Sequence, residues 1–235
     1  MQMPMTPADI AGMIDLSCVQ TTSSKADIEE MVYAARRYGF GQVSVLQCFI
    51  PYTRQLIADA PNIRIVGNVS FPTGSDTTSL KILQAKEMIS AGCDEIDMVM
   101  NIGRLRSGEF AGVEADVRAV VDTVYPVLVK VIIEVMSLTQ EETQRACEIC
   151  LSSDAAFVKT GTGWAARGTT LEDVKLIKSF VGDRIKIKAS GGIRSLEALL
   201  AMYEAGARRF GVNLKSGIKI VEEALALESG AGHNR

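Results

Sequence analysis

Histidine is nearly absent from this 235-residue sequence, in which His233 is the only one. A histidine-dependent catalytic triad and a histidine-ligated metal site are therefore not expected. Proton transfer must instead use Lys, Asp, Glu, Tyr, Cys or water. This narrows the chemistry that the protein is expected to perform.

Basic runs are also missing, since 25 Lys and Arg stand against 28 Asp and Glu, for a net charge of -3. This balance gives no reason to expect nucleic acid or a membrane as a partner, so we expect a small ligand. The N-terminus lacks a charged segment followed by an apolar one, and the five cysteines are scattered, which predicts a reduced, cytoplasmic protein. Cys147 and Cys150 form a C-x-x-C pair, but no second pair or nearby histidine completes a zinc site, so no metal is expected.

Short β-branched segments alternate with longer amphipathic ones along the chain. The eight candidate strands are 14–15, 42–48, 63–69, 95–100, 129–135, 156–159, 185–189 and 209–212. Helical patterns cover 24–38, 77–91, 112–125, 139–152, 170–180, 195–205 and 216–228. Three of these begin with a cap at Ser24, Thr139 or Thr170, each followed by an acidic residue three positions later.

This alternation predicts an α/β fold with a parallel sheet closed into a (β/α)8 TIM barrel. An open, doubly wound sheet is the alternative. No change in composition marks a boundary, so we expect a single domain over residues 1–228 and a loose tail over residues 229–235.

Three charged residues lie late in predicted strands, where a TIM barrel places its active site. Lys159 and Lys188 end apolar strands and precede glycine-bearing turns, and Asp97 interrupts a third strand. Two ammonium groups about 5 Å apart would repel by roughly 3 kcal/mol, or about 2 pKa units, which leaves one of them a free amine near neutral pH. A free amine attacks an aldehyde or ketone to form an imine, and Asp97 with the second lysine fits the accompanying proton transfers. The residues alone leave the two lysines exchangeable, and a buried ion-pair network is the alternative.

Other charged or aromatic candidates receive structural interpretations. Lys130 and Lys186 lie early in their strands, where a solvated or salt-bridged role is expected. Glu134 is interpreted as support inside the barrel. Trp164, just after the turn that follows Lys159, is interpreted as a packing residue, with a lid over the substrate as the alternative.

Glycines cluster after the last three strands, and their backbone N–H groups are candidates for binding an anion. They are Gly161, Gly163, Gly191, Gly192, Gly211 and Gly217. Ordinary tight turns are the alternative.

Three segments, Glu95 to Gly103, Phe157 to Gly163 and Lys188 to Arg194, resemble in order the active-site segments of the deoxyribose-phosphate aldolases. The likeness extends over almost the whole chain. It implies a TIM barrel and a class I aldolase, without metal or cofactor, that interconverts 2-deoxy-D-ribose 5-phosphate with acetaldehyde and D-glyceraldehyde 3-phosphate. It also implies that Lys159 forms the Schiff base, that Lys188 lowers its pKa and joins proton transfer, and that Asp97 relays protons. The substrate-binding residues expected on this basis are Asp15, Thr160, Gly161, Gly163, Gly191, Gly192, Gly211, Asn213 and Lys215.

The sequence departs from that family at the phosphate loop, where Val212 to Lys215 stands in place of small hydroxyl residues. Gly161 replaces a residue that is commonly serine, and the chain ends in Asn-Arg rather than in the tyrosine of some relatives. The resemblance implies a phosphorylated sugar as the substrate. Because of these departures, an unphosphorylated aldehyde and an inactive ligand-binding barrel are the alternatives. A homo-oligomer is allowed, although no sequence feature fixes one.

Overall fold

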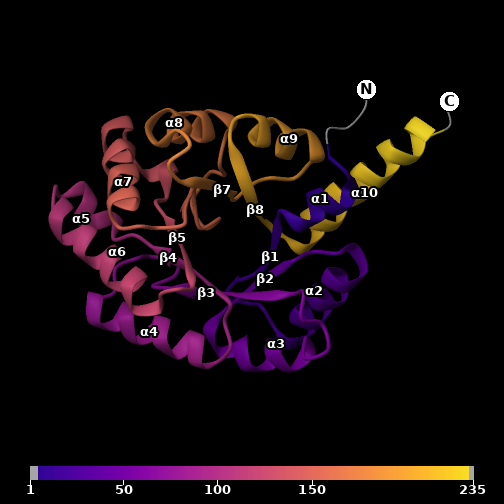
Figure 1. Cartoon of the computed structure of the whole chain (residues 1–235), viewed down its shortest axis with the longest axis horizontal. Coiled ribbons are helices and arrows are strands. Elements are labelled where there is room, and N and C mark those ends of the chain that lie inside the picture. The colour runs from indigo at the N-terminus through magenta and orange to yellow at the C-terminus, as the bar shows by residue number, and fades with distance from the viewer. Residues whose placement is uncertain (1–4, 233–235) are drawn as a thin grey trace.

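The computed structural model describes residues 5–232, and within them eight parallel strands close into a barrel in the order β1 to β8 (Figure 1). The strands are β1 Ile14–Cys18, β2 Gln42–Val45, β3 Arg64–Val69, β4 Glu95–Val99, β5 Leu128–Ile132, β6 Phe157–Lys159, β7 Lys186–Ser190 and β8 Ala207–Asn213. Closure comes from the pairing of β8 with β1, in which Asp15 lies beside Gly211. The predicted closed barrel is confirmed, and the open sheet is wrong.

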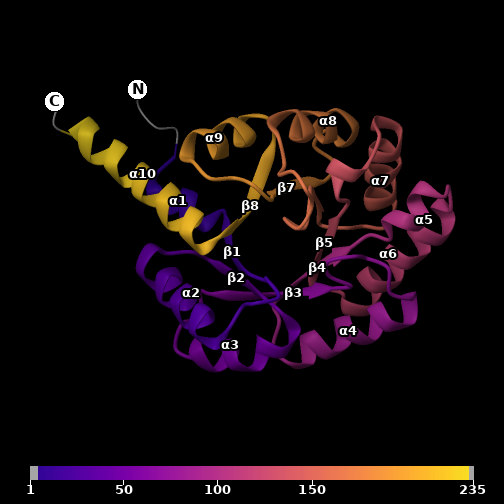
Figure 2. The same ribbon diagram turned by 180° about the vertical axis from the view of Figure 1, so that it is seen from behind.

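Helices surround the barrel (Figures 1 and 2); the first precedes β1, the last follows β8, and the others connect successive strands. They are α1 Pro7–Gly12, α2 Lys25–Tyr38, α3 Ile50–Leu56, α4 Thr78–Ser90, α5 Ile102–Arg106, α6 Phe110–Val124, α7 Gln140–Ser152, α8 Leu171–Val181, α9 Leu196–Glu204 and α10 Leu214–Gly232, with short 3-10 turns η1 Gln47–Phe49 and η2 Val135–Ser137. Capping boxes at Ser24, Thr139 and Thr170 begin α2, α7 and α8, as the sequence predicted.

The end of α10 differs from the sequence prediction. The pattern placed the end of the last helix at residue 228, but the helix continues through Gly232. Within the helix, the hydroxyl of Ser229 donates to the carbonyl of Leu225, four residues earlier, at 2.9 Å. Residues 233–235, the rest of the expected tail, lie outside the described residues. In both views α10 projects beyond the barrel, with α1 beside it (Figures 1 and 2).

The apolar core lies between the sheet and the helices. Outward-facing strand residues such as Val43, Ile65, Val131, Val158 and Ile187 are buried there. Each large aliphatic side chain that leaves water contributes roughly 1.5–3 kcal/mol, so this outer layer stabilises the barrel. Because this outer layer supplies the apolar core, the inside of the barrel can hold polar and charged side chains.

Charged side chains fill the interior of the barrel. Parallel neighbours in register point to the same face, and the register pairs Asp97 with Lys130 and Lys159 with Lys188. All four residues are at most 4% exposed. The interior is therefore a buried ionic cluster, which requires close pairing of opposite charges.

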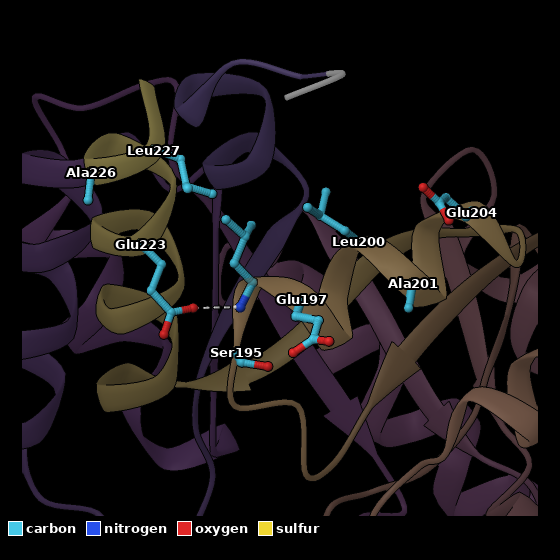
Figure 3. Close-up of a pocket in the computed structure, with 9 residues that line it drawn as sticks. Ser195, Glu197, Leu200, Ala201, Glu204, Glu223, Ala226 and Leu227 are labelled. Atoms are coloured by element: carbon cyan, nitrogen blue, oxygen red, sulfur yellow. Dashed lines mark hydrogen bonds between the residues drawn. The ribbon is translucent and has the colours of Figure 1, made fainter. Parts of the chain in front are cut away.

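A groove of about 780 Å³ lies outside the barrel, between α9 and α10 (Figure 3). Apolar side chains such as Leu200 and Leu227 line it together with three glutamates. One of these, Glu223, accepts a 2.8 Å hydrogen bond from the backbone N–H of Leu196 and so ties α10 to the start of α9. None of the expected site residues lines this groove. In the part of the chain that the structure describes, no helix is long and apolar enough to cross a membrane.

Candidate active site

One carboxylate holds both lysines that the sequence singled out. Asp97, in the middle of β4, accepts hydrogen bonds on Oδ2 from Lys159 Nζ at 2.7 Å and from Lys188 Nζ at 2.8 Å. Because both amines contact the same oxygen, they lie no more than about 5.5 Å apart. The structure thus brings together the three residues predicted to be catalytic.

A second carboxylate lies on the other side of Lys188. Asp15 of β1 accepts from Lys188 Nζ through Oδ2 at 2.5 Å and from Arg209 through Oδ1 at 3.2 Å. Asp15 is fully buried. Asp15 was expected among the substrate-binding residues, and in the structure its carboxylate holds Lys188 and Arg209 in position. Arg209 was not among the predicted site residues, because its contact depends on the closure of β8 against β1.

The cluster continues toward the N-terminal ends of the strands. Lys130 Nζ lies 3.0 Å from Asp97 Oδ1 and 2.6 Å from Glu95 Oε2, and the Lys130 side chain is fully buried. Of the two roles expected for Lys130, solvated or salt-bridged, the structure shows the salt-bridged one. Asp97 uses one oxygen for Lys130 and the other for the lysine pair, so it has no free oxygen in this arrangement.

Burial and neighbouring charges give these groups different proton affinities. The pKa of Lys159 is lowered to about 8, because burial and, to a smaller extent, the positive charges of Lys188 and Lys130 outweigh the opposing effect of Asp97. Although burial acts in the opposite direction, the ammonium groups of Lys130, Lys159 and Lys188 hold the pKa of Asp97 well below its ordinary value. Burial likewise lowers the pKa of Lys130, but Asp97, Asp15 and Glu95 outweigh it and raise this pKa above that of a free lysine.

These differences distinguish Lys159 from Lys130 within the buried cluster. With a pKa of about 8, a fraction of Lys159 is unprotonated near neutral pH and is nucleophilic, whereas Lys130 stays charged. An amine of this kind attacks a carbonyl carbon, and the adjacent Asp97 and Lys188 are within reach to move protons. The arrangement is chemically able to form an imine and to act on a bond next to it.

Thr160, Gly161 and Gly163 follow Lys159 in the loop after β6. The Thr160 hydroxyl is fully buried, donates to Ser190 O at 3.1 Å and accepts from Ser190 N at 2.9 Å. It therefore joins the ends of β6 and β7. A Cβ atom at Gly161 would lie 2.7 Å from Met136 Cε, so the loop after β5 occupies the space that a side chain there would need.

The glycine turns after β6 and β7 pack directly against each other. Gly163, Gly191 and Gly192 have φ angles of 81°, 95° and 81°. A Cβ at Gly191 would lie 3.2 Å from Gly163 Cα, and one at Gly192 would lie 3.0 Å from Gly168 Cα. Glycine is needed at these positions both for the backbone conformation and for the close approach of the two loops.

The remaining predicted substrate-binding residues lie on β8 and at the start of α10. Gly211 faces the interior, where a Cβ would lie 2.5 Å from Ser190 Oγ. Asn213 is exposed and accepts a 2.8 Å hydrogen bond from Ser216 N, which caps α10. Lys215 is exposed in the first turn of that helix, whereas Val212 is buried in the core. The loop thus offers a cation and helical N–H groups in place of side-chain hydroxyls.

Glu134 and Trp164 tie the loop after β6 to neighbouring loops. Glu134 has a φ of 48° and its carboxylate accepts from Thr162 N at 3.3 Å. Trp164 packs edge-on against Phe71, with ring centroids 6.1 Å apart, and is 41% exposed. The Trp164–Phe71 pair connects the loops after β6 and β3, a contact that sequence patterns do not reveal.

Comparisons with known proteins agree with this geometry. Residues 13–219 match the DeoC/LacD family aldolases. The chain is 42% identical over 226 residues to a deoxyribose-phosphate aldolase of Rhizobium meliloti (strain 1021), covering 96% of this chain and 91% of the relative. Among solved structures, it is similar to "QR15, an Aldolase", with 37% identity, a TM-score of 0.88 and coverage of 94% of this chain and 97% of the other.

A deoxyribose phosphate aldolase from Aeropyrum pernix, whose structure is described as a unique tetramer, gives a TM-score of 0.86 at 25% identity. That alignment covers 94% of this chain and 93% of the other. The family match spans most of the chain, and the first of these relatives exceeds 40% identity over nearly its whole length. The chain therefore belongs to the DeoC/LacD aldolase family.

Proposed function

We propose that this protein is a deoxyribose-phosphate aldolase that cleaves 2-deoxy-D-ribose 5-phosphate through a Schiff base on Lys159. The contact of Lys159 with Asp97, beside Lys188 and with a pKa of about 8, carries the proposal. The family membership and the named relatives support the choice of substrate.

The reaction begins when the free amine of Lys159 attacks C1 of the open-chain sugar. Loss of water, with a proton donated by Lys188 and with Asp97 accepting and returning protons, gives a protonated imine. This imine draws electrons from the C2–C3 bond while a base removes the proton of the C3 hydroxyl. The bond breaks to release glyceraldehyde 3-phosphate and leave an enamine on Lys159. Protonation of the enamine at C2, followed by hydrolysis, releases acetaldehyde and restores the amine.

The phosphate is proposed to lie at the ends of β7 and β8. Gly192 is exposed and Gly191 partly exposed there, and Lys215 and the first turn of α10, next to Asn213, supply positive charge. An unphosphorylated substrate is the alternative, because the buried Val212 near the end of β8 has no hydroxyl with which to bind phosphate. We also propose that the protein works in the cytoplasm and forms a homo-oligomer, the latter by analogy with the tetrameric relative.

Borohydride trapping tests this function. The protein is mixed with 2-deoxyribose 5-phosphate and borohydride, and the modified residue is identified by intact mass and peptide mapping. An adduct on Lys159 that is absent in Lys159→Ala is the expected result. Trapping with unphosphorylated 2-deoxyribose at equal efficiency would support the alternative substrate. A folded protein that gives no adduct with either sugar would contradict the proposal.

A further inference from the structure

A second cavity, of about 300 Å³, opens at the N-terminal end of the barrel, away from the proposed substrate site. Its lining comes from the starts of β6, β7 and β8 and from the end of α8 with the residues that follow it. The lining residues are Phe157, Lys178, Asp183, Ile185, Lys186, Gly206, Arg208 and Arg209. Lys186 lies two residues before Lys188 on β7, so the cavity lies directly below the ionic cluster.

Positive charge dominates this cavity, which is lined by four cations and one carboxylate. That carboxylate, Asp183, already pairs with Lys178 at 2.6 Å. Within residues 5–232, Lys186 and Arg208 form no ion pair with a carboxylate. The guanidinium of Arg209 pairs with Asp15, inside the barrel, at 3.2 Å. Lys186, Arg208 and Arg209 therefore meet at the cavity without a close counter-ion there, although Asp183 acts on Arg208 at longer range.

The protein holds these three cations in fixed positions. Lys186 Nζ and Arg209 Cζ lie 5.7 and 5.9 Å from the centroid of the same Phe157 ring. The guanidinium of Arg208 donates to the carbonyls of Tyr203 and Ala207 at 2.9 and 2.8 Å. Like charges gathered in this way repel one another, and a bound anion would relieve the repulsion while accepting charge-assisted hydrogen bonds.

We propose that this cavity binds a small phosphate dianion, as inorganic phosphate or as a phosphomonoester, on Lys186, Arg208 and Arg209. Arginine forks and a lysine ammonium are the groups that suit tetrahedral phosphate oxygens. The volume admits a phosphate group with a short substituent. Because Arg209 also contacts Asp15, which holds Lys188, the bound anion competes with Asp15 for the guanidinium.

Calorimetric titration of the full chain with inorganic phosphate, in a phosphate-free buffer of low ionic strength, tests the site. Lys186→Ala combined with Arg208→Ala is expected to weaken one binding event at least about tenfold, the effect of one lost charge-assisted hydrogen bond. Lys215→Ala, at the opposite end of the barrel, and Lys175→Ala, on the exposed surface of α8, serve as matched controls that retain this event. Unchanged binding in the double variant, or loss of all binding in Lys215→Ala, would overturn the proposal.

Chemical footprinting of the unmodified protein gives a second test that needs no variant. Acetylation of Lys186 by an amine-reactive ester, followed by peptide mapping, is expected to slow as phosphate is added, while acetylation of Lys175 is unchanged. Repetition with glycerol 3-phosphate distinguishes the two ligand sources, since the one that protects at lower concentration is the better fit. Equal rates at Lys186 with and without both anions would refute the site. Neither test depends on aldolase activity, so its outcome is independent of the proposed function.

Discussion

Replacement of Lys188 by methionine should make Lys159 a poorer nucleophile at neutral pH. The two amines are at most about 5.5 Å apart, so at an effective dielectric constant near 20 their repulsion is at least about 3 kcal/mol, or about 2 pKa units. Without Lys188, the pKa of Lys159 should rise from about 8 toward about 10. The carboxylate of Asp15, then paired only with Arg209 among the described residues, acts in the same direction.

The consequence appears in the rate of imine formation. With a pKa of about 8, roughly one Lys159 in eleven is unprotonated at pH 7, whereas with a pKa near 10 the fraction is about one in a thousand. Trapping with borohydride at pH 7 should therefore be about 100-fold slower in Lys188→Met. The pH at which the trapping rate reaches half its maximum, the midpoint, gives the apparent pKa of Lys159.

The matched control is Lys186→Met, on the same strand but exposed at the other end of the barrel. Its midpoint should remain near that of the unmodified protein, which is expected at about 8. Circular dichroism confirms that each variant is folded. A midpoint that stays near 8 in Lys188→Met would refute the electrostatic argument and would assign the lowered pKa to burial alone.

Three other changes probe the site. Asp97→Asn leaves Lys159 without its carboxylate and should lower the free energy of unfolding by about 3–5 kcal/mol, measured by urea denaturation; an unchanged midpoint would contradict the buried cluster. Gly192→Ala places a side chain at a φ of 81° and should cost about 1–2 kcal/mol in the same assay, unlike Gly103→Ala, where no such angle occurs. Chelation with EDTA should leave turnover unchanged, because residues 5–232 contain no group of three or more His, Cys, Asp or Glu side chains placed to hold a metal ion; a loss of activity that added metal restores would contradict this expectation.

The sequence was sufficient for the barrel because its signals are local. Apolar strands and helix caps are each recognised from residues that are close together in the sequence. All eight strands and the starts of α2, α7 and α8 were therefore predicted. Short helices such as α1, α3 and α5 were not predicted, since five to seven residues give too little periodicity.

The sequence identified the residues of the candidate site but not the contacts among them. Lys159, Lys188 and Asp97 were recognisable as charges late in apolar strands. Which lysine titrates near neutral pH depends on burial and on distances set by strand register, which no local pattern contains. The contact of Arg209 with Asp15 joins residues 194 positions apart, and only the closed barrel brings them together.

The origin of the interior charges bears on how the two halves of the chain depend on each other. The buried carboxylates of the cluster come from β1 and β4, whereas its buried lysines come from β5, β6 and β7. Either half of the barrel, taken alone, would carry an excess of one sign along its inner face. Assembly of the two halves therefore neutralises the charges on their inner faces. A single half, or two copies of the same half, should not close into a stable barrel, because like charges would face one another inside it. Exchange of one half with that of another barrel would succeed only if the incoming half supplies charge of the missing sign.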